Sequence, residues 1–165
     1  MGGEYPSGYE FNFFGYNISA AAHVVATWPG RITFSGFEMG KNVFSGAELT
    51  TRGPANDPVK AAYRWYSGYN NSRESWDPLT MLYAIYGLGD IFAYGNKCGY
   101  NLVYPNGTNV WQLGKKADGI HHYLKLKISP PLAGALLDQL YLKGAATSAS
   151  AIDSFPQYRL INNAA

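Results

Sequence analysis

A short helical pattern that runs directly into a strand pattern is the feature that most restricts how this chain can fold. Ser19 is a suitable N-cap for a helix over about 20–27. Trp28-Pro29-Gly30 should end that helix, because proline disfavours helical backbone in the residue before it. Residues 31–40 have the sequence RITFSGFEMG, a β-branched and aromatic strand followed by a glycine-bounded turn. A helix followed at once by a strand is typical of α/β proteins, so we expect this fold class.

Two further helices are predicted to begin at Asp-Pro pairs. Asp57 precedes Pro58, and Asp77 precedes Pro78. Aspartate suits an N-cap and proline suits the first helical turn, so both aspartates are expected to cap helices. Apolar and aromatic residues then recur at helical spacing, at Val59, Ala62, Tyr63 and Tyr66 in the first segment and at Leu79, Leu82, Tyr83 and Tyr86 in the second.

The character of the chain changes after residue 90. Aromatic and β-branched residues alternate with polar ones, and Asn106-Gly107 is a strong turn signal, so we expect a β-hairpin region around 100–128. Residues 132–143 (LAGALLDQLYLK) predict an amphipathic helix that Gly144 ends. The small and polar residues 146–165 predict a flexible tail, which leaves residues 1–145 as the expected domain.

Composition excludes several classes of protein. The chain has 165 residues, of which 47% are hydrophobic and 15% charged, as expected for a folded globular domain. Its net charge of +2 is spread along the sequence without a basic cluster, so no nucleic-acid partner is expected. The sequence contains no run of about 18 apolar residues, so no membrane-spanning helix is expected. A single cysteine, Cys98, cannot form an internal disulfide.

Localisation is left open by the sequence. The first residues show neither the basic nor the apolar segment of a signal peptide. N-glycosylation sequons at Asn17, Asn70 and Asn106 would matter only in a secreted protein.

Three motifs, in order, resemble the inosine-uridine-preferring nucleoside hydrolase family. They are MGG at 1–3 followed by EFN at 10–12, the helix-to-strand unit that ends in ITFSGFEMG, and Ser75-Trp76-Asp77-Pro78. The resemblance covers about residues 1–145 and corresponds to the C-terminal half of the family's domain. The sequence of these motifs is most similar to that of fungal members. It implies the C-terminal part of an open, mostly parallel sheet with flanking helices, in addition to the hairpin region.

The family's activity, part of purine and pyrimidine salvage, is cleavage of a ribonucleoside's N-glycosidic bond. The resemblance implies that Met1, Glu10 and Asn12 line a ribose pocket, with Glu10 and Asn12 holding hydroxyls chiefly on the 5′ side. The alternative from the residues alone is that Glu10 and Asn12 only cap a local turn, which acidic and amide side chains often do.

The segment around Trp76 departs from the family pattern. Many members carry a histidine there, proposed to protonate the leaving base, whereas a tryptophan cannot titrate and could only stack on a base or pack. The resemblance makes Asp77 a calcium ligand that also touches a ribose hydroxyl. One aspartate cannot hold calcium, which takes six to eight oxygen ligands, and the alternative for Asp77 is an ordinary N-cap.

The family's D-x-D-x-x-x-D-D cluster, which binds calcium and supplies the general base, does not occur in this sequence. We therefore expect no catalytic residue and an inactive isolated chain. Its expected ligand is a ribonucleoside or ribose-like molecule, and its partner a missing N-terminal half or a second copy. The alternative function is a non-catalytic, secreted binding module.

Three other titratable positions are given structural interpretations. Glu38 is expected to be a buried carboxylate paired locally rather than a catalytic one. His121 and His122 should alternate across a strand and so cannot share a metal, and both are expected at the surface or in the hairpin. His23 is expected to be a satisfied structural histidine.

Overall fold

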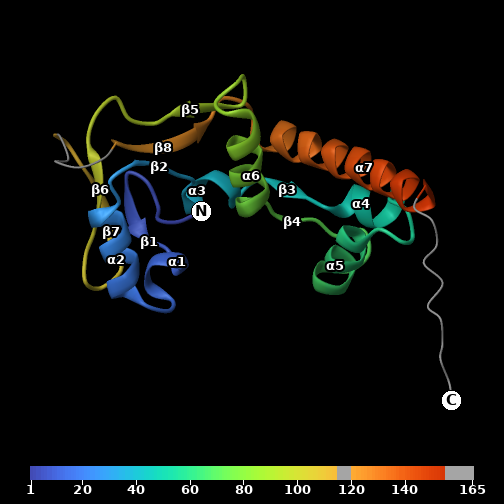
Figure 1. The fold of residues 1–165 in the computed structure, drawn as a ribbon, viewed down its shortest axis with the longest axis horizontal. Coiled ribbons are helices and arrows are strands. Elements are labelled where there is room, and N and C mark those ends of the chain that lie inside the picture. Colours follow the sequence, from blue (N-terminus) through green and yellow to red (C-terminus); the bar gives the residue numbers. More distant parts are fainter. Residues whose placement is uncertain (115–119, 155–165) are drawn as a thin grey trace, which may run out of the picture. The chain divides into compact units, whose positions relative to one another are not determined.

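The computed structural model describes residues 1–114 and 120–154, which form a mixed α/β fold (Figure 1). They contain seven helices and three small open sheets. The predicted α/β class is thereby confirmed in its coarse form. The helices are α1 (Phe11–Phe14), α2 (Ile18–Thr27), α3 (Phe37–Gly40), α4 (Ala47–Arg52), α5 (Pro58–Ser67), α6 (Trp76–Tyr86) and α7 (Pro130–Ser154). The strands are β1 (Ser7–Tyr9), β2 (Arg31–Phe34), β3 (Phe44–Ser45), β4 (Arg73–Glu74), β5 (Phe92–Tyr94), β6 (Tyr100–Val103), β7 (Thr108–Gln112) and β8 (Ile120–Leu126).

The chain packs as two compact units. Unit 1 consists of Met1–Ser45 and Arg73–Ala135, and unit 2 consists of Gly46–Ser72 and the chain from Leu136 onward. The sequence predicts a nucleoside hydrolase-like domain over residues 1–145 and a tail over 146–165. The division into two units does not test these boundaries, so they stay a prediction.

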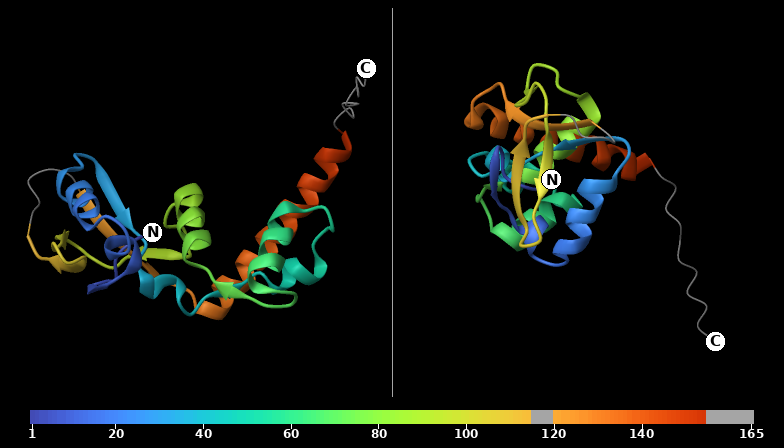
Figure 2. Two further views of the ribbon diagram at one scale, coloured as in Figure 1. Left: turned by 90° about the horizontal axis from the view of Figure 1, so that it is seen from below. Right: turned by 90° about the vertical axis from the view of Figure 1, so that its left-hand side faces the viewer.

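The helix-to-strand unit predicted for 20–34 is present as α2 followed by β2. In unit 1, β2 pairs in parallel with β8, and β5 pairs antiparallel with the other edge of β8 (Figures 1 and 2). The β2–β8 pair is the parallel one among the described strands, and the remaining strand pairs are antiparallel. N-capping differs from the prediction, since the side chain of Asn17, not Ser19, accepts from the N–H of Ala20.

The predicted hairpin is confirmed for β6 and β7, and β1 adds to the other edge of β7. Gly107 has φ +88, a conformation that glycine adopts without strain, and Asn106 Oδ1 accepts from Thr108 N–H at 3.0 Å. The expectation that the hairpin region extends to 128 is wrong, because β8 pairs with β2 and β5 instead. The alternation of apolar and polar residues along a strand indicates which side chains share a face of the sheet. It does not indicate which other strand pairs with it.

Aromatic side chains dominate the core of unit 1. Tyr5 stacks on Tyr123 with ring centroids 5.0 Å apart and an angle of 10° between planes, and it also contacts Phe34. Phe13 and Val25 bring α1 and α2 into the same cluster. This core fixes the segment that precedes β1 against β8, and that segment forms one wall of the pocket described below.

Unit 2 is built from α4, α5 and α7. Asp57 caps α5 as predicted, accepting from Lys60 N–H at 2.6 Å. The hydroxyls of Tyr63 and Tyr141 lie 3.1 Å apart, which connects α5 to α7. The prediction that Gly144 ends the last helix is wrong, since α7 continues to Ser154. The residues from 155 on, within the predicted tail, lie outside the described part of the chain.

Candidate functional site

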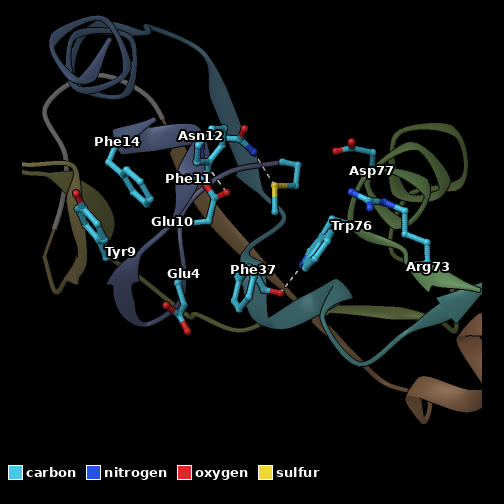
Figure 3. Close-up of a pocket in the computed structure, with 11 residues that line it drawn as sticks. Glu4, Tyr9, Glu10, Phe11, Asn12, Phe14, Phe37, Arg73, Trp76 and Asp77 are labelled. Atoms are coloured by element: carbon cyan, nitrogen blue, oxygen red, sulfur yellow. Dashed lines mark hydrogen bonds between the residues drawn. The ribbon is translucent and has the colours of Figure 1, made fainter. Parts of the chain in front are cut away.

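A pocket of about 440 Å³ lies within unit 1, and all the residues that line it belong to that unit (Figure 3). It contains every residue that the sequence proposes for ligand or metal binding. Those residues come from the chain start, from α1 and from the first turn of α6. The lining consists of Met1, Glu4, Tyr9, Glu10, Phe11, Asn12, Phe14, Phe37, Arg73, Trp76 and Asp77.

The chain start is held against the segment that follows β2. Gly2 N–H donates to the carbonyl of Ser35 at 3.0 Å, and Phe37 N–H donates to that of Gly3 at 2.8 Å. The two glycines are required here, because a Cβ on Gly2 would lie 2.9 Å from the ring of Phe13, and Gly3 has φ +77. The MGG motif therefore lets the chain pass closely between α1 and α3, and it brings Met1 to the pocket.

Glu10 is buried and caps α1. One carboxylate oxygen accepts from Gly3 N–H and the other from Asn12 N–H, both at 3.0 Å. The capping role that was the alternative for Glu10 is thus present, and Glu10 also lines the pocket. A carboxylate offers about four lone-pair positions, so these two bonds leave acceptor capacity toward the pocket. Its binding role stays a prediction.

Asn12 is exposed and only weakly engaged. Its side-chain Nδ2 donates to the Met1 thioether sulfur at 2.9 Å, and sulfur is a poor acceptor. The side-chain amide oxygen of Asn12 has no hydrogen-bond partner among the described residues. A ligand hydroxyl could replace the sulfur at little cost, so Asn12 has the freedom that a binding residue needs.

Trp76 forms part of the aromatic wall. Its ring stacks on Phe37 at 5.4 Å, with 23° between the planes, and its Nε1–H donates to the Phe37 carbonyl at 2.8 Å. Because that N–H is already bonded, the indole offers the pocket a flat apolar face and no proton.

Asp77 lies in the first turn of α6, but it is not the N-cap that was predicted. Ser75 holds that position, without a side-chain capping bond. The Asp77 carboxylate is exposed and makes no hydrogen bond or ion pair with the described residues. Figure 3 shows it at the Trp76 end of the pocket, together with Arg73.

Calcium does not fit the residues of this chain alone. The described residues contain no group of three or more His, Cys, Asp or Glu side chains that could hold a metal ion. Asp77 offers two oxygens at most, whereas calcium takes six to eight. We therefore derive no chemical step through a metal.

Glu38 is half-buried, and the partner of its carboxylate is distant in sequence rather than local as expected. One oxygen accepts from Tyr5 N–H at 3.0 Å, and the other is buried without a partner among the described residues. Burial is the main cause that raises the pKa of Glu38, and nearby Glu4 adds to it. Glu38 does not line the pocket.

The adjacent histidines point to opposite faces of β8, as predicted. His121 contacts Phe34 and is 2% exposed, and its Nδ1 accepts from Asn101 N–H at 3.1 Å. His122 stacks on Tyr94 at 3.9 Å, and burial lowers the pKa of His122. The surface placement predicted for His121 is therefore wrong.

His23 also differs from its prediction. Its side chain is exposed on α2 and makes no hydrogen bond or ion pair with the described residues. A structural role for this histidine is therefore not supported.

Several lining residues were not foreseen, namely Glu4, Tyr9, Phe11, Phe14, Phe37 and Arg73. Tyr9, Phe11 and Phe14 adjoin the EFN motif, and Glu4 directly follows MGG. Closeness in sequence to those motifs was the signal that could have pointed to them.

Comparisons with protein-family models, with curated proteins and with solved structures gave no match to this chain. No helix among the described residues is both long enough and apolar enough to span a membrane.

Proposed function

We propose that unit 1 carries the ribose-binding side of a nucleoside N-glycosidic hydrolase pocket. The observation that supports this proposal most strongly is that Met1, Glu10, Asn12, Trp76 and Asp77 line one pocket. They come from two stretches more than sixty residues apart in sequence. The sequence motifs that contain them carry no information on their positions in the fold, so their convergence favours a shared site over separate structural roles.

The polar groups of the pocket suit a sugar. A ribose hydroxyl both donates and accepts, so it needs acceptors and donors close together. Glu10 and Asp77 supply carboxylate oxygens, and Asn12 supplies an amide donor and an acceptor. The stacked Phe37 and Trp76 rings add an apolar face for the flat base.

The sequence lacks the aspartate cluster to which the family resemblance assigns activation of the water. Water must be ionised, and positioned acid–base catalysis contributes about 10²–10⁴-fold to a rate. The D-x-D-x-x-x-D-D motif is absent from the sequence, and Trp76 cannot act as the acid. We propose that the aspartates and the calcium site are completed by a missing N-terminal half and that the isolated chain is inactive.

Strand β2 offers a place where such a partner would join. It is at the edge of the β2-β8-β5 sheet, and no described strand pairs along its outer side. A groove of about 540 Å³ borders it and is lined largely by apolar side chains, including Ala21, Val24 and Ile32. Exposed strand edges beside apolar surface favour pairing with another strand. We propose that partner strands in parallel with β2 complete a mostly parallel sheet.

Reconstitution tests the enzymatic proposal. The chain is co-expressed with an N-terminal half that carries the aspartate cluster, and ribose release from inosine or uridine is measured in calcium-containing buffer. We expect release from the pair and none from the chain alone. A stable pair that releases no ribose would overturn the proposal.

The alternative is that this chain acts as a binding module by itself, with β2 closing a homodimer. The same pocket would then hold a nucleoside without cleaving it. Light scattering separates the two: a dimeric chain that binds inosine favours the module, and a monomeric chain that binds inosine but releases ribose only after reconstitution favours the hydrolase.

A further inference from the structure

One end of the pocket has a chemistry that sugar binding does not explain. Figure 3 shows Tyr9 and Phe14 at one side, Trp76 and Asp77 at the other, and Glu10 between them. We call the part formed by Glu4, Tyr9, Phe11 and Phe14 the aromatic end.

The rings of the aromatic end contact one another, and two of the three are exposed. Tyr9 and Phe14 stack at 4.0 Å with 3° between their planes, and Phe11 meets Phe14 edge-on at 5.6 Å. Tyr9 is 55% exposed and Phe11 is 52% exposed. Exposed clusters of large apolar side chains at the mouth of a pocket are typical of surfaces that a ligand covers.

Glu4 supplies a negative charge at this end. Glu4 lines the pocket, and its carboxylate makes no hydrogen bond or ion pair with the described residues. Glu10 lines the pocket as well, and among the lining residues the one cationic side chain is that of Arg73, which Figure 3 places at the opposite end. The aromatic end therefore carries negative charge.

The position of Glu4 is fixed by the fold. Asn109 is fully buried, and its side chain accepts from Glu4 N–H and donates to the Glu4 carbonyl, both at 2.9 Å. The Glu4 side chain lies across Gly8 so closely that a Cβ on Gly8 would overlap its Cβ and carboxylate. A residue held in this way presents its charge at a defined place, as a specificity determinant must.

We propose that the aromatic end binds a positively charged substituent on the 5′ carbon of the nucleoside and disfavours a 5′-phosphate. The inference rests on the proposed function, which places Glu10 and Asn12 at the 5′ side of the ribose. Cations are attracted to the faces of aromatic rings, and a neighbouring carboxylate adds to that attraction. Among the four residues of the aromatic end, a phosphate would meet the carboxylate of Glu4 and no cationic side chain.

Isothermal titration calorimetry with the full chain tests the proposal. The probes are adenosine, 5′-amino-5′-deoxyadenosine and adenosine 5′-monophosphate. We expect the amine to bind about fivefold tighter than adenosine, and the phosphate more weakly than adenosine. Glu4→Gln should remove the preference for the amine over adenosine.

Two further variants sharpen the test. Asp90→Asn makes the same charge change on a fully exposed side chain outside the pocket and should keep the preference. Gly8→Ala keeps the Glu4 charge but displaces the side chain, so it should reduce the preference as Glu4→Gln does.

The outcomes separate this inference from the proposed function. If adenosine binds but the amine binds no tighter, or if Glu4→Gln keeps the preference, the aromatic end is not a cation subsite and the ribose proposal stands. If the amine alone binds and depends on Glu4, the cation subsite stands and the nucleoside proposal fails. If no probe binds, both fail.

Discussion

Asn109 holds the backbone of Glu4 in the pocket wall. It bonds to both backbone groups of Glu4, and its Nδ2 also donates to Asn101 Oδ1 at 3.2 Å. Asn109→Ala would remove the partner of three polar groups, namely the Glu4 N–H, the Glu4 carbonyl and the side-chain oxygen of Asn101. Asn101 is buried. Each buried group left unsatisfied costs about 1–3 kcal/mol. Because water can reach the Glu4 groups in part, we expect a loss of about 3–5 kcal/mol of unfolding free energy.

Urea unfolding followed by circular dichroism measures this loss, and Asn106→Ala is the matched control. Asn106 lies in the same hairpin and also bonds to backbone, but it is exposed, so its replacement should cost about 1 kcal/mol or less. Absence of a cooperative transition in Asn109→Ala would count as a loss at least as large as expected. If the two variants lose equal stability, the buried amide does not hold the wall as argued.

Three other replacements test separate parts of the account. Gly144→Ala should stabilise the chain by about 0.5–1 kcal/mol in thermal or urea unfolding, because α7 passes through Gly144 with open space around it; destabilisation would mean that the glycine ends the helix. Glu38→Gln should become more stable relative to the unchanged chain as pH rises from about 4 to 7. The pKa of Glu38 is raised in the native protein, so the unchanged chain loses stability as this carboxyl ionises. A stability difference that does not change with pH would refute this reasoning. Glu10→Gln should lose about 1–3 kcal/mol, because an amide nitrogen would then face the N–H of Gly3 or Asn12; a neutral result in urea unfolding would contradict the double cap.

Local features of the fold could be predicted from the sequence. Asp57-Pro58 and Asn106-Gly107 act within a few residues of themselves, so they specify a helix start and a hairpin turn wherever the chain goes afterwards. Capping positions shifted by one or two residues, as with Asn17 and Ser75, because several nearby side chains suit the same role.

Features that depend on distant partners could not be predicted in the same way. The alternation in β8 is the same whether it pairs with a hairpin strand or, as observed, with β2 and β5. Gly144 is a sensible helix end by local propensity, yet α7 continues through it.

Some residues of the candidate site could be predicted from sequence motifs, and others could not. Motifs pointed to Glu10, Asn12 and Trp76, but Trp76 reaches the pocket through its contact with Phe37, 39 residues earlier in the sequence. Glu4 has no motif of its own. Its place depends on Asn109, which is 105 residues away in sequence, and on the missing Cβ of Gly8. Only the folded chain brings these three residues together.

The central claim is that this pocket holds a ribose, and titration of inosine into the unchanged chain and into Asn12→Ala tests it most directly. The amide of Asn12 is exposed and bonds only to a thioether sulfur, so its removal should change unfolding free energy by less than about 0.5 kcal/mol. We expect the unchanged chain to bind inosine and Asn12→Ala to bind it at least about tenfold more weakly, the loss expected for one or two hydrogen bonds. Equal affinity of the two proteins, or no binding by the unchanged chain, would contradict it.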